Sequence, residues 1–178
     1  VHSLLGINFR IDSLRAALGL AQLEVLPEQL KTRIELCEYL DKMLEEIEGV
    51  TPGRSPQKEA ENAYWMYTFL IDKQRFSCTA DDFAKAVKAE GLPQIGTGRY
   101  YLLPETMAML HKGTDEYNRL VKTIPRLAER EYGGDMTAKA KKRLDRMIRW
   151  NPTHKYSAED IKDIYLMIKK VADYYRKK

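Results

Sequence analysis

Two polar side chains near the start of the chain have the types and the spacing that suit an anion. Asn8 and Arg10 stand two residues apart, directly before a predicted helix that Asp12 or Ser13 can cap. An amide and a guanidinium can donate hydrogen bonds to a phosphate, together with the free backbone N–H groups of a helix N-terminus. The alternative is that Asn8 caps a turn and Arg10 pairs with a carboxylate. Spacing alone favours that alternative.

The helix predicted after this pair is apolar on more than one face. Its main stripe, at helical spacing, consists of Leu14, Ala17, Leu18, Ala21 and Val25. Leu20 and Leu23 lie outside the stripe, and Ala16 and Gly19 are small. Such a pattern indicates a helix buried between two partners, because a surface helix needs only one apolar face.

A long motif at the start of the chain resembles one found in a known protein family. Residues 2–26, HSLLGINFRIDSLRAALGLAQLEVL, resemble the opening of the second half of the DegT/DnrJ/EryC/StrS-type sugar aminotransferases, enzymes of fold type I that use pyridoxal phosphate (PLP). That family shows a histidine, then G-[YF]-N-[YF]-R-[ML], then a polar residue before LQAAIGLAQL. The matching positions are His2, Gly6, Asn8, Phe9, Arg10, Ala16, Ala17, Gly19, Leu20, Ala21, Gln22 and Leu23. Ile7 replaces the usual aromatic residue, and Arg15 the usual glutamine. A match of this length and order moves the interpretation of Asn8 towards function.

The resemblance implies site residues, a cofactor and partners. Asn8, with Arg10 beside it, is expected to bind the cofactor phosphate, Asn8 reaching across a homodimer to the neighbour's active site. Tyr101, Arg99 and His2 are expected near the substrate. The implied reaction moves an amino group from glutamate or glutamine, through PLP, to a keto group of a nucleotide-linked sugar or a cyclitol. The protein then supplies binding and orientation, while the cofactor supplies the organic chemistry.

The resemblance also implies a domain organisation. In this family the Schiff-base lysine and the large PLP-binding domain precede the Asn8 motif, and no lysine precedes Asn8 here. We therefore expect the C-terminal part of a longer enzyme, without a catalytic residue of its own. Residues 1–49 are expected to form interdomain and dimer helices, and residues 50–178 a small α+β domain. Some relatives are dehydratases in which histidine replaces the lysine, and that position is not visible here.

The rest of the pattern predicts an α+β fold: long N-terminal helices, then a small antiparallel sheet covered by helices. Pro27 either opens a second helix or kinks the first, and Gly49 ends the helical pattern. Residues 63–71, AYWMYTFLI, form the strongest predicted strand. It should be central, with both faces covered and Trp65 buried, because neither face is charged. Further elements are a helix capped by Thr79, short strands at 92–97 and 147–152, and a last helix capped by Ser157.

Two later segments leave alternatives open. Gly96 and Gly98 flank Thr97, so the backbone there either approaches a ligand closely or simply bends. In the family an aromatic residue near the sugar nucleotide is often followed by a histidine. Glu105 and Thr106 stand in that neighbourhood here, which leaves the substrate class open.

A basic cluster in residues 139–146 is the other open feature. Its members are Lys139, Lys141, Lys142, Arg143 and Arg146. We favour a solvated helix face, and the alternative is a site for a phosphate-rich substrate or nucleic acid. A net charge of +4 is mild, and the aromatic strand lacks interleaved basic residues, so a nucleic-acid partner is not expected. A non-catalytic interaction module remains a rival interpretation.

Composition excludes several other classes. The chain has no apolar run of about 18 residues, so no membrane span is expected. Cys37 and Cys78 form no CxxC motif, which argues against a disulfide framework or zinc site and fits a reducing cytoplasm. Cys37 falls on an apolar stripe and is predicted to be a buried, unreactive thiol. His154 has no paired ligand or nucleophile nearby, so no metal site is predicted.

Overall fold

A four-stranded antiparallel sheet organises the chain. The structure, a computed structural model, describes residues 11–54, 61–98, 102, 104, 107–132 and 134–177. The strands are β1 (Val50–Pro52), β2 (Tyr67–Ile71), β3 (Gly96–Thr97) and β4 (Met147–Trp150), in the order β1-β2-β4-β3. In the central pair Tyr67 faces Trp150 and Phe69 faces Ile148. The α+β class predicted from the sequence is confirmed.

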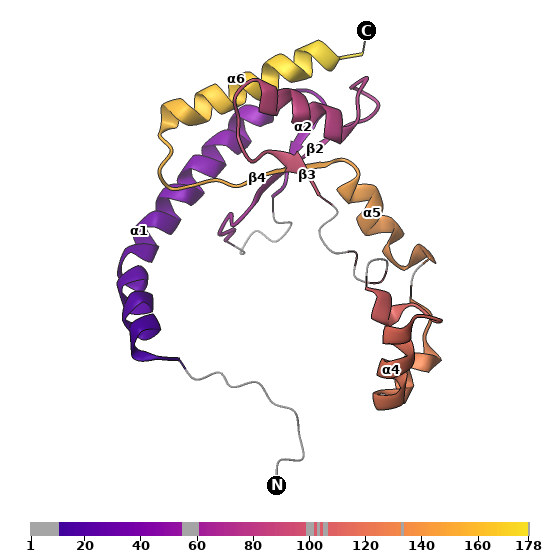
Figure 1. Cartoon of the computed structure of the whole chain (residues 1–178). Helices are drawn as coiled ribbons and strands as arrows, with labels where there is room; N and C mark the ends of the chain where they lie inside the picture. The colour runs from indigo at the N-terminus through magenta and orange to yellow at the C-terminus, as the bar shows by residue number, and fades with distance from the viewer. Residues whose placement is uncertain are drawn as a thin grey trace.

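Helices pack against one side of this sheet and extend beyond it (Figure 1). They are α1 (Ser13–Leu44), α2 (Ala80–Ala89), α4 (Asp115–Thr123), α5 (Ala138–Leu144) and α6 (Ala158–Tyr175), with short 3-10 turns η1 (Ala108–Leu110), η2 (Pro125–Glu129) and η3 (Gly134–Thr137). The first half of α1 and the segment around α4 both extend away from the sheet, well apart from each other (Figure 1).

Helix α1 runs through Pro27 without ending. Proline lacks an N–H group, so the carbonyl four residues earlier, that of Leu23, loses its helical partner. Of the two alternatives predicted at Pro27, the start of a second helix is wrong, because α1 continues past the one hydrogen bond that proline removes.

One apolar core joins the second half of α1 to the sheet, α2 and α6. From α1 and the turn after it, the core takes Cys37, Leu40, Leu44 and Ile47. The ring of Phe83 on α2 meets Phe69 and Phe76 edge-on, at centroid distances of 6.3 and 5.6 Å. The buried thiol predicted at Cys37 is confirmed.

The central strand is shorter than predicted. β2 is indeed flanked by β1 and β4, and its residues alternate between buried and half-buried. The chain turns at Tyr64, which has a φ of +45°, so the extended backbone begins only later. Trp65, predicted to point inward, is instead 69% exposed. The outer face of the strand, at Thr68 and Leu70, is only half-buried, so the predicted burial of both faces is wrong.

The predicted helix caps are confirmed. Thr79 and Asp82 form a capping box on α2, and Ser157 and Asp160 form one on α6. The strand predicted at 92–97 shrinks to Gly96–Thr97, because Gln94 adopts a φ of +58° and interrupts the extended backbone. The strand predicted at 147–152 ends at Trp150, before Pro152.

Candidate functional site

The residues predicted from the sequence to bind cofactor or substrate are not placed by the structure. His2, Asn8, Arg10, Arg99 and Tyr101 all lie outside the described residues, as do Glu105 and Thr106. The structure does show which elements these segments adjoin. His2, Asn8 and Arg10 precede α1 in the sequence, and Arg99 and Tyr101 follow Gly98, the residue after β3.

The start of α1 is capped by a carboxylate. Oδ1 of Asp12 accepts a hydrogen bond from the backbone N–H of Arg15 at 2.8 Å, and the Arg15 side chain lies 3.3 Å from Oδ2. Of the two predicted caps, Asp12 is therefore the one used. An anion that approaches this helix end therefore meets the negative charge of Asp12.

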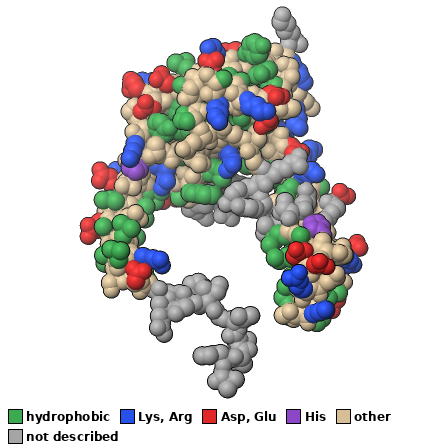
Figure 2. Space-filling view, in the orientation of Figure 1, with side chains coloured by type: hydrophobic (Ala, Val, Ile, Leu, Met, Phe, Trp, Pro, Cys, Tyr) green, Lys and Arg blue, Asp and Glu red, His purple; other side chains and the backbone are tan. Residues whose placement is uncertain are grey.

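The first half of α1 exposes most of its apolar side chains. Leu14 is 81% exposed and Leu18 60%, while Leu20, Leu23, Val25 and Leu26 are also exposed. Figure 2 shows hydrophobic side chains gathered along this half of the helix, at the left of the view. An exposed apolar stripe of this length is typical of a surface that another protein domain or subunit covers.

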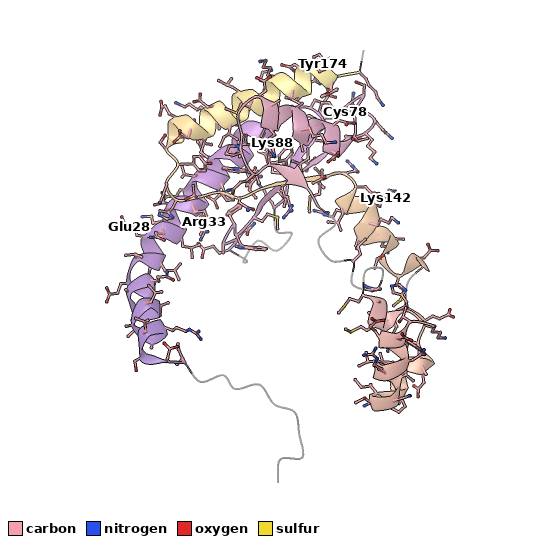
Figure 3. The ribbon with its side chains drawn as sticks, viewed as in Figure 1. Glu28, Arg33, Cys78, Lys88, Lys142 and Tyr174 are labelled. Carbon is pink, nitrogen blue, oxygen red and sulfur yellow. The ribbon has the colours of Figure 1, made fainter. Side chains whose placement is uncertain are left out.

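Farther along α1, Nε of Arg33 is buried without a hydrogen-bond partner. Figure 3 labels this side chain, near the middle of the helix.

The glycine after β3 has a structural partner. A Cβ atom at Gly98 would lie 2.8 Å from Nε of Arg149, whereas one at Gly96 would meet open space. The close neighbour of Gly98 is therefore an arginine of the same chain, and an approach of this backbone to a ligand stays a prediction. Arg149 lies on the half-buried outer face of β4 and was missed by sequence reasoning. The sequence feature that could have identified Arg149 is a charged residue within an otherwise apolar strand, at a position that faces away from the buried side chains.

A pocket of about 380 Å³ lies at the N-terminus of α2, lined by Lys73, Thr79, Ala80, Asp81, Thr97, Gly98, Leu144 and Asp145. Asp81 accepts from Thr97 at 3.2 Å and pairs with Lys85 at 2.6 Å, and these donors keep the pKa of Asp81 below its ordinary value. Two carboxylates, Asp81 and Asp145, line the pocket and repel an anionic phosphate. The pocket therefore does not fit the phosphate of PLP.

The basic cluster of residues 139–146 lines a second pocket. This pocket, of about 410 Å³, is formed by Leu70, Lys139, Lys142, Arg143 and Arg146. The three α5 side chains are exposed, as the favoured interpretation predicted. The side chain of Arg146 is positioned by a contact within the chain, since its Nε donates a hydrogen bond to the backbone carbonyl of Ile71 at 2.9 Å. We call this pocket the basic groove.

Behind the sheet a buried carboxylate collects hydrogen bonds. Asp41 of α1 is 2% exposed and accepts from the hydroxyls of Tyr67 and Tyr64 and from Nε of Arg54. Burial, reinforced by the Asp41 charge, raises the pKa of both tyrosines well above the ordinary value. The same two causes raise the pKa of Cys37 from 9.0 to about 12, so its thiol stays protonated at neutral pH. This cluster holds the fold together and offers no nucleophile.

Within the described part of the chain, no group of three His, Cys, Asp or Glu side chains is arranged to hold a metal ion. Among the same residues, no helix combines the length and the apolar character that crossing a bilayer requires.

Sequence comparison places the chain among known proteins. The profile of the DegT/DnrJ/EryC1/StrS aminotransferase family matches residues 1–147. The chain belongs to this family. The match to the DegT/DnrJ/EryC1/StrS family includes the segment of Asn8 and Arg10, all of α1 and the sheet as far as the first residue of β4. The resemblance stated from residues 2–26 is thereby confirmed.

Two curated proteins are similar to parts of this family member. GDP-perosamine synthase of Caulobacter vibrioides is 28% identical over 89 residues, which cover 50% of this chain and 24% of that protein. The 3-amino-5-hydroxybenzoate synthase of Amycolatopsis mediterranei is 30% identical over 101 residues, which cover 55% of this chain and 25% of that protein. The aligned part of the chain thus spans about a quarter of each relative's length.

Solved structures share the fold. An aminotransferase from Psychrobacter cryohalolentis superposes with a TM-score of 0.66 at 15% identity, over 98% of this chain and 42% of that one. A 3-amino-5-hydroxybenzoic acid synthase gives 0.64 at 20% identity, over 98% and 42%. A GDP-4-keto-6-deoxymannose-3-dehydratase, solved with a trapped PLP-glutamate geminal diamine, gives 0.62 at 15%, over 93% and 37%. These likenesses confirm the expected α+β fold.

Proposed function

We propose that this chain acts as the C-terminal part of a cytoplasmic, PLP-dependent aminotransferase. The observation that carries the proposal is the family match over residues 1–147. Residues 1–49 then form the interdomain and dimer helices, and residues 50–178 form the small domain. By the family resemblance, the Schiff-base lysine is expected in a preceding part of the protein.

The proposed reaction transfers an amino group from glutamate or glutamine to a keto group of a nucleotide-linked sugar or a cyclitol. The names of the relatives support this substrate class, since one is a GDP-sugar enzyme and the other makes an amino-substituted ring acid. PLP, when bound, supplies the chemistry of amino transfer. This chain contributes Asn8 and Arg10 to the cofactor phosphate, and Tyr101, Arg99 and His2 to the substrate.

The exposed half of α1 supports a shared, dimeric active site. Leu14 and Leu18 follow the Asn8–Arg10 segment directly, so whatever covers them also lies close to that segment. We assign this face to contacts with the cofactor-binding domain and with a second copy of the protein. In that arrangement Asn8 reaches the cofactor phosphate of the neighbouring subunit.

The isolated chain provides the first test. It is expected to be inert with glutamate, and to retain no PLP after borohydride reduction and gel filtration. Mass spectrometry of tryptic peptides reads out the modified positions. A stoichiometric adduct on one specific lysine of this chain would contradict the proposal, because that lysine would then serve as the Schiff-base residue.

Activity needs the longer protein. With a nucleotide-linked keto sugar or a keto cyclitol, and with glutamate as donor, amine product and 2-oxoglutarate should form in equal amounts. Loss of a hydroxyl from the sugar without gain of nitrogen would instead identify a dehydratase, the alternative that the solved dehydratase fold leaves open. Absence of both products across both substrate classes would overturn the proposed reaction.

The role of Asn8 is tested by substitution and by mixing subunits. Asn8→Ala removes a neutral donor to a charged acceptor, an interaction worth about 1.5–3 kcal/mol. PLP affinity should therefore fall by roughly ten- to a hundred-fold while the fold is retained. An inactive lysine variant and an inactive Asn8 variant are then allowed to exchange subunits. Recovered activity supports a shared site, and no recovery despite verified exchange places Asn8 elsewhere.

A further inference from the structure

The basic groove is a charged surface that the aminotransferase proposal does not use. Lys139, Lys142 and Arg143 stand at positions i, i+3 and i+4 of α5, so they share one helix face. They line the groove together with Leu70, which lies on the half-buried outer face of β2. Figure 3 labels Lys142 on α5, beside the sheet. Arg149 adds a further cation to the outer face of the sheet, on β4.

Three of the four charges of this groove are not compensated within the described residues. Arg146 lies 4.0 Å from the carboxylate of Asp72, whereas among the described residues none of the three α5 side chains forms an ion pair, and no acidic residue lines the groove. Cations elsewhere are commonly paired, as Lys85 is with Asp81 and Lys170 with Glu90, each at 2.6 Å. Clustered like charges repel one another, so a bound anion would stabilise this arrangement.

The helix dipole explains only part of this arrangement. Lys142 and Arg143 stand in the last turn of α5, where cations favour the exposed carbonyl groups. Lys139, however, stands in the first turn, where the dipole disfavours a positive charge. The helix dipole therefore does not account for Lys139 on this face.

We propose that the basic groove binds a ligand with two linked phosphate groups, a diphosphate. The three α5 cations and Arg146 line one pocket of about 410 Å³, which is larger than a single phosphate needs and offers more positive charge. The apolar floor at Leu70 suits the body of a small molecule. A nucleic-acid strand would need an extended groove with stacking rings, whereas the lining of this pocket contains no aromatic side chain. The inference holds for this chain whether or not the longer protein transfers amino groups.

Isothermal titration calorimetry with inorganic pyrophosphate tests the inference on the 178-residue chain. The test variant is Lys142→Gln with Arg143→Gln. The control is Lys162→Gln with Lys169→Gln, which removes the same charge from exposed positions of α6. Binding of one pyrophosphate per chain is expected. The affinity should fall by about ten-fold or more in the test variant and stay within about two-fold in the control. All four positions are exposed, and circular dichroism checks that both variants fold.

Titrations with other ligands identify the class of molecule that the groove binds. Orthophosphate should bind at least about five-fold more weakly than pyrophosphate, because it contacts fewer of the cations. A free nucleoside diphosphate should compete with pyrophosphate, since the diphosphate is the recognised group. Three results would each overturn the proposal: no saturable binding, an equal loss of affinity in the control variant, or tighter binding of a single-stranded oligonucleotide that the test substitutions abolish.

Discussion

The hydroxyl of Tyr67 donates a hydrogen bond to Oδ1 of Asp41 at 2.5 Å, and this bond ties β2 to α1. Both side chains are buried. A buried carboxylate is tolerated because its oxygens are satisfied, here by Tyr67, Tyr64 and Arg54. The second half of α1 is therefore held to the sheet by a polar cluster as well as by apolar packing.

Tyr67→Phe should destabilise the chain measurably. It removes a hydrogen bond to a charged acceptor, worth about 1.5–3 kcal/mol, and leaves part of the buried Asp41 carboxylate without a donor. Urea unfolding followed by circular dichroism gives the change in unfolding free energy. The matched control is Tyr165→Phe, whose hydroxyl bonds the exposed Glu46 at 3.2 Å. Equal losses in the two variants would show that the Asp41 cluster contributes nothing special.

Stability should fall as the pH rises above the ordinary thiol pKa. In the unfolded chain Cys37 ionises near 9.0, whereas burial raises its folded pKa to about 12. Between these values the unfolded state binds fewer protons, so unfolding becomes easier by at most about 1.4 kcal/mol per pH unit from this group. Raised pKa values at Tyr64 and Tyr67 act in the same direction at still higher pH.

Unfolding measured at pH 8 and pH 10.5 checks this expectation. Cys37→Ala removes one titrating group, so its stability should decline less steeply over that interval than that of the parent chain. An identical slope in the two proteins would show that the thiol is accessible to solvent in the folded state.

Two aromatic residues of one segment should respond differently to truncation. Phe69 is buried against Phe83, so Phe69→Ala should cost about 3–5 kcal/mol. Trp65 is 69% exposed, and Trp65→Ala should cost less than about 1 kcal/mol. Thermal unfolding of the two variants measures both losses of stability. Comparable losses would mean that the chain does not turn at Tyr64 as described.

The two halves of α1 should also respond differently to the same substitution. Leu40→Ala empties a core site and should cost about 2–5 kcal/mol. Leu18→Ala changes an exposed position, so the unfolding free energy should stay within about 0.5 kcal/mol of the parent value. A large loss at Leu18 would reveal packing within the chain that covers this half.

Local signals predicted much of the fold. The capping boxes at Thr79 and Ser157 were readable because each depends on two residues three positions apart. The central place of β2 followed from its apolar composition. Its true start did not, because the left-handed backbone at Tyr64 has no signal in an aromatic run. Continuation of α1 through Pro27 was one of two alternatives that the sequence left open, because the loss of one hydrogen bond does not by itself decide whether a helix ends.

The candidate site was less predictable. The family motif identified Asn8 and Arg10 as residues of interest, and their role stays a prediction because they lie outside the described residues. The basic run on α5 was visible in the sequence. Its meeting with Leu70 was not, because these residues are far apart in the chain and only the sheet and α5 bring them together. Arg149 likewise gains its neighbour, Gly98, through the pairing of β3 with β4.

The uninterrupted run of α1 has a mechanical consequence. At 1.5 Å per residue its 32 residues form a rod about 48 Å long, anchored in the core at one end and free at the other. A protein domain or subunit that binds Leu14 and Leu18 is therefore connected, through one continuous helix, to the core that packs on the sheet. If the helix keeps its shape, a rotation of that domain or subunit would be transmitted to the sheet and, through it, to the end of β3 and the basic groove. Pro27, which lacks one helical hydrogen bond, is the place where the helix would bend first.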